Sequence, residues 1–228
     1  TVGYALVSLE EQLLPLVSYS GVWVHSSEFK KQLPAAGEMT RSFHLVVADG
    51  EPEAVAREVR VLTKETGLTK VSGTVKDSAG TAVQGARVHV QKADTKKTYI
   101  TMTRSDAKGA YSLELSAGKY TFTVVADGRA KAAATSVTVA STAVSKDLTV
   151  GTTGTIQVTV TDDNGAAIPA KVVYTGKTSP GSYAATFGEK RYPHGAAFID
   201  FSADGKSTAK RPPDTYTAPV SRGSEYEI

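Results

Sequence analysis

The side chains best suited to catalysis or metal binding are scattered along this chain. Its four histidines lie far apart, and no His-x-His or His-Glu-x-x-His motif gives two of them the spacing of a zinc site. His44 and His89 fall in predicted strands, whereas His194 lies in a long Tyr- and Gly-rich segment. We therefore expect no catalytic residue, no metal site and no cofactor.

The acidic residues are more typical of turns than of a metal or catalytic site. Asp162-Asp-Asn-Gly165 lacks the alternating oxygen ligands and the terminal glutamate of an EF-hand calcium loop. Asp77 and Asp106 are predicted to accept backbone hydrogen bonds in turns. The sequence contains no nucleophile elbow, phosphate loop or Gly-x-Gly-x-x-Gly, so nothing in it indicates a hydrolase nucleophile or a nucleotide site. The absence of cysteine excludes disulfides and thiolate zinc sites.

Composition indicates a folded protein and excludes two kinds of partner. The 228 residues are 40% hydrophobic and 21% charged, which suits one to three domains with real cores. The net charge is only +3 and the basic residues are scattered, so no basic face for nucleic acid is expected. No apolar run approaches the roughly 18 residues that span a bilayer. Because the chain starts with Thr1, we interpret it as a mature form or an excised piece.

Residues 1–68 are predicted to form a β/α segment. Short apolar runs at 13–17, 19–24 and 43–47 indicate strands. A helix should follow, with Asp49 as N-cap, Pro52 in the first turn and Gly67 as C-cap, because its apolar residues recur at helical spacing (Val55, Val59, Leu62). One hypothesis is that this segment is the tail of a larger sandwich domain.

The rest of the chain is predicted to be β throughout. Residues 69–150 contain about seven short strands with turns every 8–12 residues, which is typical of a β-sandwich. Residues 151–228 repeat the theme, with strands at 156–161 and 171–174 and a long Gly-, Pro- and Tyr-rich connection at 176–195. Long loops at the end of a sandwich are where binding usually occurs.

One strand-turn-strand cassette occurs twice. It opens with Gly73-Thr-Val-Lys-Asp77 and Val158-Thr-Val-Thr-Asp162, and both copies later place a tyrosine eleven residues after a glycine, Gly109 to Tyr120 and Gly205 to Tyr216. The first copy resembles the carboxypeptidase regulatory-like domain, a transthyretin-type β-sandwich, through residues in the family's order: Gly73, Val75, Asp77, Gly80, Val83, Ala86, Val88, Asp106, Gly109, Tyr111, Leu113, Gly118, Tyr120 and Val124.

The resemblance implies a mainly β fold of tandem Greek-key, transthyretin-like sandwiches with one N-terminal helix. The domains are then 1–68, 69–150 and a divergent second sandwich, 151–228. The second copy has Asp214 where the first has Gly118, and it carries Pro212-Pro213.

The C-terminal part is similar to a segment that precedes a polymerase-and-histidinol-phosphatase-type metallohydrolase domain in large bacterial secreted or periplasmic proteins. The similarity runs from Gly154 through Ile168-Pro-Ala to Ser221-Arg-Gly-Ser-Glu-Tyr-Glu227. It implies an extracellular or periplasmic location and an adjacent domain as partner. Arg222, Glu225 and Tyr226 would then contact that domain; the alternative is an ordinary edge strand with a surface salt bridge.

Two functions fit these observations. The first is a non-catalytic structural or interaction role, in which the sandwiches position or accompany the catalytic domain. The second is a carbohydrate- or peptide-binding surface on the long loop, with His194 and four aromatic residues as stacking candidates, Tyr174, Tyr183, Phe187 and Tyr192. Exposed aromatic side chains would support the second function, and aromatic side chains buried beneath the loop would remove it.

Overall fold

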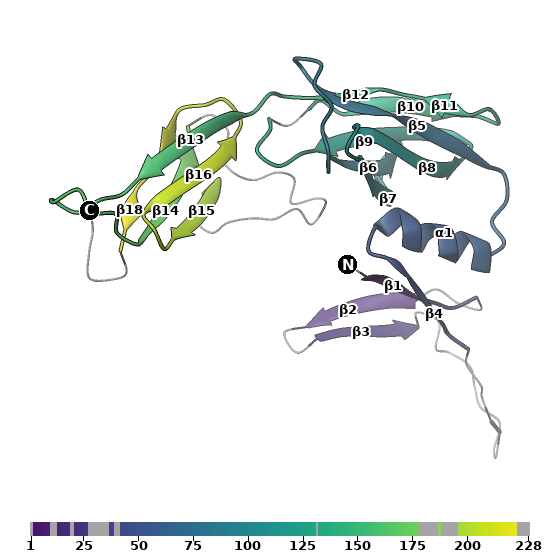
Figure 1. Ribbon diagram of the computed structural model, residues 1–228. Helices are drawn as coiled ribbons and strands as arrows, with labels where there is room; N and C mark the ends of the chain where they lie inside the picture. Colours follow the sequence, from purple (N-terminus) through teal and green to yellow (C-terminus); the bar gives the residue numbers. More distant parts are fainter. Residues whose placement is uncertain are drawn as a thin grey trace. The chain divides into compact units, whose positions relative to one another are not determined.

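The structure is a computed structural model, and it describes residues 2–9, 13–18, 21–26, 37–38, 42–130, 132–177, 187 and 196–222. The chain divides into two compact units, residues 1–68 and 69–228. Strands dominate and the described residues contain one α-helix, which confirms the mainly β fold class (Figure 1).

The first unit contains two antiparallel strand pairs and the helix. Strand β1 (Val2–Val7), which the sequence analysis missed, pairs with β4 (His44–Asp49), while β2 (Leu13–Ser18) pairs with β3 (Gly21–Ser26). Helix α1 (Pro52–Leu62) packs on β1 and β4. The β1–β4 pair also carries exposed apolar side chains, Val2, Tyr4, Leu6, Leu45 and Val47.

The helix ends differ from those expected. Asp49 belongs to β4, and the N-cap is Glu51, whose side chain makes no capping hydrogen bond. Pro52 at the first helical position suits this start, because its fixed φ matches the helix and an N–H at this position would have no partner within the helix. At the other end Thr63 is the C-cap, and Lys64 takes the left-handed conformation with φ 53°. Gly67 is also left-handed but lies beyond the cap, so its prediction as C-cap was wrong.

Residues 68–150 form a β-sandwich (Figure 1). One sheet has the order β10-β9-β6-β7, and in the other β5 pairs with β11, β12 and β8. The strands are β5 (Leu68–Asp77), β6 (Arg87–Lys92), β7 (Tyr99–Arg104), β8 (Ala110–Ser116), β9 (Gly118–Val125), β10 (Thr135–Val139), β11 (Val144–Ser145) and β12 (Leu148–Val150).

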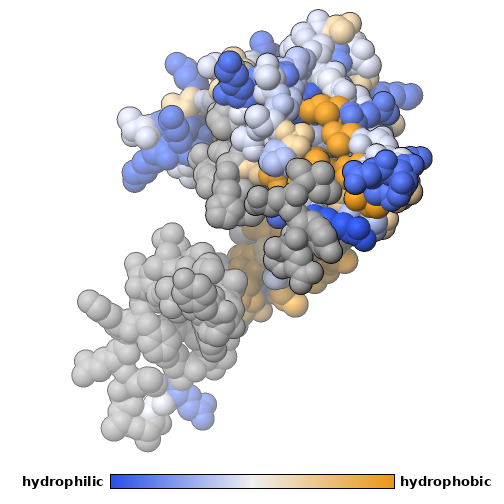
Figure 2. All heavy atoms as spheres, turned by 90° about the vertical axis from the view of Figure 1, so that its left-hand side faces the viewer, coloured by the Kyte–Doolittle hydropathy of each residue, from blue (hydrophilic) through white to orange (hydrophobic). Residues whose placement is uncertain are grey.

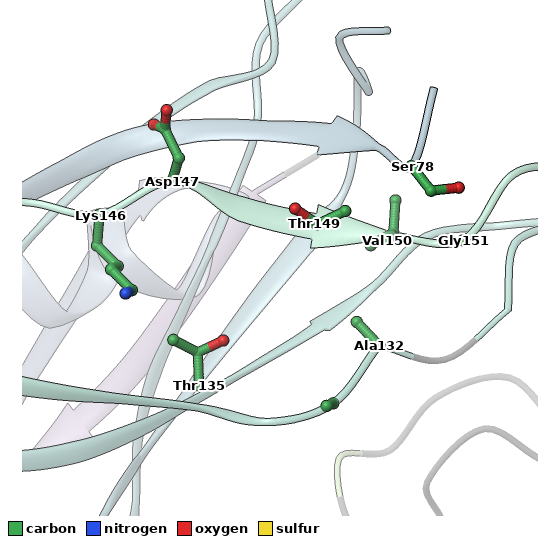
Figure 3. A pocket seen from close by; sticks show the side chains of 9 residues that line it. Ser78, Ala132, Thr135, Lys146, Asp147, Thr149, Val150 and Gly151 are labelled. Atoms are coloured by element: carbon green, nitrogen blue, oxygen red, sulfur yellow. The ribbon is translucent and has the colours of Figure 1, made fainter. Parts of the chain in front are cut away.

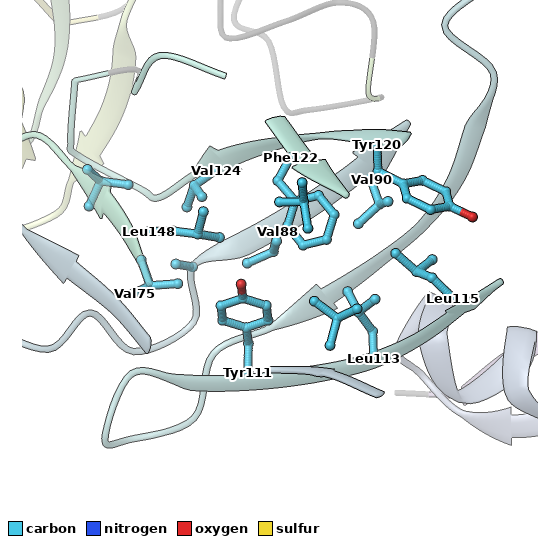
Figure 4. Close-up of a cluster of buried hydrophobic side chains, with 14 of the residues drawn as sticks. Val75, Val88, Val90, Tyr111, Leu113, Leu115, Tyr120, Phe122, Val124 and Leu148 are labelled. Carbon is cyan, nitrogen blue, oxygen red and sulfur yellow. The ribbon is translucent and has the colours of Figure 1, made fainter. Parts of the chain in front are cut away.

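Alternating apolar residues on these strands build one core. Tyr111, Leu113 and Leu115 of β8 point toward Phe122 and Val88 of the facing sheet (Figure 4). Phe122 and Val88 are fully buried. Removing a side chain of this size from water contributes about 1.5–3 kcal/mol, so this core is the main source of stability for the sandwich.

The second sheet contains two parallel strand pairs. Strands β11 and β12 both pair with β5 in parallel, at Val71–Ser72 and at Val75–Asp77. Between them the chain leaves the ladder at Lys146 and Asp147. Gly73 of β5 lies beside this break, close to the Lys146 carbonyl.

Residues 154–221 form a smaller set of antiparallel pairs. Strand β13 (Gly154–Thr159) pairs with β16 (Lys206–Arg211), and β14 (Ala170–Gly176) pairs with β15 (Phe198–Ser202), β17 (Tyr216–Thr217) and β18 (Val220–Ser221). Their core is small and is centred on Val172, Tyr174 and Ala209.

The two cassettes make the same turn. The Asp77 carboxylate accepts hydrogen bonds from the Ala79 and Thr81 N–H groups at 3.0 and 2.9 Å. The Asp162 carboxylate accepts them from Asn164 and Ala166 at 2.9 and 2.8 Å. Each turn ends with a glycine at positive φ, so turn formation was predicted correctly from the Asp and Gly spacing.

The later glycine and tyrosine of each cassette also have matching contacts. The carbonyl of Gly109 accepts from the N–H of Val75 at 2.7 Å, and that of Gly205 from Val160 at 2.8 Å. The hydroxyl of Tyr120 donates to the carbonyl four residues before it at 2.9 Å, and that of Tyr216 does the same at 2.8 Å. The divergent sequence between glycine and tyrosine therefore leaves this local geometry unchanged.

Candidate functional site

Tyr174 lies in the core of the 154–221 module. Its side chain is fully buried in β14, and its hydroxyl lies 2.7 Å from the Ser207 hydroxyl. Ser207 in turn donates to Asp200 at 2.6 Å. The prediction that Tyr174 stacks on a ligand was therefore wrong, because its position on strand β14 alternates inward with Val172.

Phe187 is the one described member of the other predicted stacking residues. Its ring stacks on the ring of His89, with centroids 4.5 Å apart and planes at 10°. The Tyr99 ring is 6.0 Å away and tilted. Tyr183, Tyr192 and His194 lie outside the described residues.

His89 is the centre of this aromatic cluster, and sequence reasoning missed its role. It lies on β6 with only 2% of its surface exposed, and its Nδ1 lies 3.1 Å from the Tyr99 hydroxyl. The contact comes from a residue almost a hundred positions later in the chain, Phe187. No local pattern in the sequence signals such a contact.

A groove of about 830 Å³ lies beside Phe187. The polar side chains that line it come from β6, the β6–β7 turn and β9: Gln91, Lys92, Lys96, Lys97, Thr121 and Thr123. Gln91 donates to the Lys97 carbonyl at 3.0 Å, which holds the turn against the strand. Three ammonium groups against one carboxylate, Asp94, give the groove a positive balance that suits an anionic ligand. The Lys96-Lys97 pair beside a strand was the only signal of this groove in the sequence.

Arg222 is exposed just after β18. Glu225 and Tyr226, the other residues predicted to contact an adjacent domain, lie outside the described residues. That interface therefore stays a prediction.

Among the described residues, no three His, Asp or Glu side chains gather as metal ligands would. Among the same residues, no helix has both the length and the apolar character to cross a bilayer. The face drawn in Figure 2 is largely hydrophilic where residues are described, with its hydrophobic side chains in smaller patches.

Residues 70–151 match the model of the carboxypeptidase regulatory-like domain. This match covers the first cassette and its sandwich, so it confirms the resemblance of this region that was predicted from the sequence. It leaves residues 152–222 to be interpreted from their own contacts.

Three solved structures resemble the fold more distantly. A streptococcal ancillary pilin is 15% identical at a TM-score of 0.40, and the match covers 68% of this chain and 53% of the pilin. A DUF3823 family protein from Parabacteroides merdae is 14% identical at a TM-score of 0.32, and the match covers 68% of this chain and 90% of that protein. Catechol 1,2-dioxygenase from an Acinetobacter species is 14% identical at a TM-score of 0.31, and the match covers 38% of this chain and 53% of the dioxygenase.

The chain thus spans about half the length of the pilin and of the dioxygenase. At these scores the similarities support no statement about function. No curated protein matches the chain in sequence.

A second hollow, of about 440 Å³, lies on the carboxypeptidase regulatory-like domain (Figure 3). Thr135 of β10 lines one side, and Lys146, Asp147 and Thr149 line the other. The N–H of Thr74 donates to Asp147 at 2.8 Å and holds the pKa of that carboxyl below its ordinary value. Asp147 is therefore a stable anion that fixes backbone, which suits a structural role better than acid–base catalysis.

Asp77 and Arg129 join two turns of the carboxypeptidase regulatory-like domain. The Arg129 guanidinium donates to the Asp77 carboxylate and to the Gly151 carbonyl, both at 3.0 Å. The pKa of Asp77 is lowered, first by the hydrogen bond from the Thr81 N–H and further by Arg129. The pair thus connects the first turn of the domain to its final residue.

Proposed function

We propose that this chain is a set of non-catalytic β-sandwich modules that position or accompany another domain of the same polypeptide. One observation supports this most strongly: the side chains that could do chemistry are used to hold the fold. Asp77, Asp106 and Asp162 accept backbone hydrogen bonds in turns, and the hydroxyl groups of Tyr111 and Tyr120 donate to backbone carbonyls.

The domain boundaries belong to the same proposal. Residues 1–68 form a β/α segment, 69–150 the carboxypeptidase regulatory-like sandwich, and 151–228 a divergent copy of it. The matching Asp turns and tyrosine contacts support a tandem repeat, because both copies keep the same hydrogen bonds despite different residues.

The adjacent domain, in this proposal, is a metallohydrolase of the polymerase-and-histidinol-phosphatase type, in a secreted or periplasmic protein. The similarity of the segment from Gly154 to Glu227 to sequences that precede such domains supports it. The exposed position of Arg222 suits a contact with the adjacent domain, to which Glu225 and Tyr226 would contribute.

Metal content and reading frame test the proposal together. The purified chain should carry well under about 0.1 metal ion per molecule by mass spectrometry, because a structural or catalytic site would fill at stoichiometry. The reading frame after Ile228 should encode a His- and Asp-rich domain. Stoichiometric zinc, iron or manganese in this chain alone would contradict the non-catalytic role.

A charge reversal tests the interface in the protein that contains both domains. Arg222→Glu should lower the melting temperature of the adjacent domain, whereas Lys210→Glu, at an exposed position of β16, should leave it unchanged. Equal effects of both variants would argue against a contact at Arg222.

Binding of a carbohydrate or peptide is the second candidate, and the groove beside Phe187 favours it. Lysines, hydroxyl groups and an aromatic ring in one groove match the needs of an acidic sugar chain or acidic peptide. Isothermal titration with polygalacturonate and with poly-glutamate would separate the two ligands. Phe187→Ala and Lys97→Gln should each weaken binding about tenfold, and Lys210→Gln should not. No heat with either polymer would contradict this candidate.

A further inference from the structure

The two edges of the β10-β9-β6-β7 sheet are built differently. The β7 edge is protected, because a bulge interrupts its pairing between Val90 and Gln91 and because lysines precede it, Lys96 and Lys97. Strand β10 pairs with β9 without a bulge and lies in a stretch, 132–145, that contains no charged residue, proline or glycine. Natural sheets usually blunt a free edge with just these devices, so an edge without them is suited to pairing.

Within the described residues, the outer side of β10 has backbone groups that no other backbone group pairs with. In an antiparallel ladder, alternate residues direct their N–H and C=O groups away from the paired strand. No hydrogen bond joins that side of β10 to another backbone group in the described part of the chain. A hollow of about 440 Å³ adjoins one end of the strand, at Thr135 (Figure 3).

The strand is also complementary to itself. Val137 and Val139 are buried on the core side, whereas Ser136 and Thr138 are exposed on the other. In an antiparallel pair of two β10 strands centred on Val137, Ser136 opposes Thr138 of the second copy. Every core-side residue then meets a core-side residue, and no like charges face each other.

From these features we propose that β10 binds a second copy of this chain, edge to edge and antiparallel, about a two-fold axis centred near Val137. Two sheets would then join into one across the dimer. Because the strand carries no charge, it has no group that would select a charged peptide. A second β10 strand has the same alternation of core-side and exposed residues, so each residue meets one of its own kind. The protected β7 edge prevents further addition, so the assembly stops at a closed dimer.

The expected dimer is weak. A five-residue strand pair buries less than the roughly 1,200 Å² of a standard interface, and backbone hydrogen bonds that replace bonds to water add little net affinity. The dissociation constant should therefore lie in the range of about 10 μM to 1 mM. Sedimentation equilibrium of the full chain over a concentration series measures it directly.

Lysines on the exposed face of the strand should weaken the dimer. Ser136→Lys with Thr138→Lys keeps the core side of β10 intact, and dissociation should become at least about tenfold more favourable. The control carries the same added charge on exposed strand positions elsewhere, Ser112→Lys with Thr155→Lys, and should dimerise like the unchanged protein. Circular dichroism and melting temperature establish that both variants fold.

Crosslinking tests the register without relying on a disruptive variant. The chain contains no cysteine, so a mixture of Ser136→Cys and Thr138→Cys chains can form a disulfide only through the introduced thiols. Opposed residues in an antiparallel pair have Cα atoms about 4.5–5.5 Å apart, within disulfide range. The mixture should crosslink faster than either variant alone.

Three results would overturn the proposal: a monomer at every concentration up to about 1 mM, equal crosslinking by the single variants and the mixture, or a dimer that withstands the β10 lysines. A dimer dissociated instead by Tyr4→Ser with Leu45→Ser would place the interface on the exposed apolar side chains of β1 and β4.

Discussion

Gly73 lies so close to Lys146 that a Cβ atom on the glycine would overlap the Lys146 carbonyl oxygen. The contact occurs where β5 passes the break between its two parallel partners, β11 and β12. On both sides of the break hydrogen bonds hold the chain, from Lys146 N–H to Ser72 and from Thr74 N–H to Asp147, each 2.8 Å long. The backbone there cannot move away without losing them.

Replacing Gly73 by alanine should therefore destabilise the sandwich. We expect a loss of about 2 kcal/mol or more in the free energy of unfolding, measured by urea denaturation, because a backbone clash cannot be relieved by rotating a side chain. Gly154→Ala is the control, since its new Cβ would meet the Arg211 carbonyl oxygen at an ordinary 3.6 Å. Similar losses in both variants would show that the close approach is unimportant.

Gly109 and Gly205 should prove equivalent. Both have positive φ, and a Cβ would meet the carbonyl oxygen of Val75 at 2.6 Å in one and of Val160 at 2.5 Å in the other. Each change to alanine should cost about 2–3 kcal/mol, the left-handed penalty plus the clash. At Gly165, which has positive φ but open space around it, the same change should cost only about 1–2 kcal/mol.

Urea denaturation of the three variants in the full chain would separate the left-handed penalty from the clash. A change at Gly205 that costs no more than the change at Gly165 would argue against a shared geometry in the two cassettes.

Stability should fall in acid because of Asp77. Its pKa is lowered in the folded protein, so its contribution is fully present above the unfolded value of about 3.9 and is lost as the pH falls through the folded pKa. Asp147 and Asp204 act in the same direction. Urea midpoints measured from about pH 6 to pH 2 should therefore decline below about pH 4.

Asp77→Asn should make that decline shallower and should lower stability at neutral pH, since the ion pair with Arg129 is lost. Asp163→Asn, in the exposed second turn, is the matched control and should leave the pH profile unchanged. An unaltered profile in Asp77→Asn would assign the acid transition to other carboxylates.

Tyr111 should resist ionisation. Burial raises the pKa of its hydroxyl, and the nearby charge of Asp147 raises it further. The hydroxyl also donates to the Lys146 carbonyl at 2.5 Å. Stability should therefore hold up to the unfolded pKa of about 10 and fall as the pH rises beyond it, because only the unfolded state readily releases that proton.

Ultraviolet titration compares Tyr111→Phe with the unchanged protein. The variant should lose the most alkaline tyrosine transition and about 1 kcal/mol of stability at neutral pH. A normal titration of all tyrosines in the unchanged protein would contradict the buried hydrogen bond.

The turns and most strands of residues 69–150 were predictable from local sequence. Asp77 with Gly80 specifies a turn through side-chain geometry and positive φ, and both are properties of nearby residues. The structure then shows which side of β8 faces the core, the side of Tyr111, Leu113 and Leu115. Strand β1 was missed, and the helix N-cap fell two residues after its predicted position, because neither has a strong local signal.

The residue types and spacing alone thus determined a mainly β chain, its Asp–Gly turns and a sandwich over residues 69–150. Only the tertiary structure decided that Tyr174 is core, that Phe187 stacks on His89 and that Gly73 faces Lys146. Each of these contacts joins residues distant in the chain, so it depends on strand pairing and packing between layers. Local propensity carries no information about which distant residue arrives at a given face, and for that reason the candidate site was harder to predict than the fold.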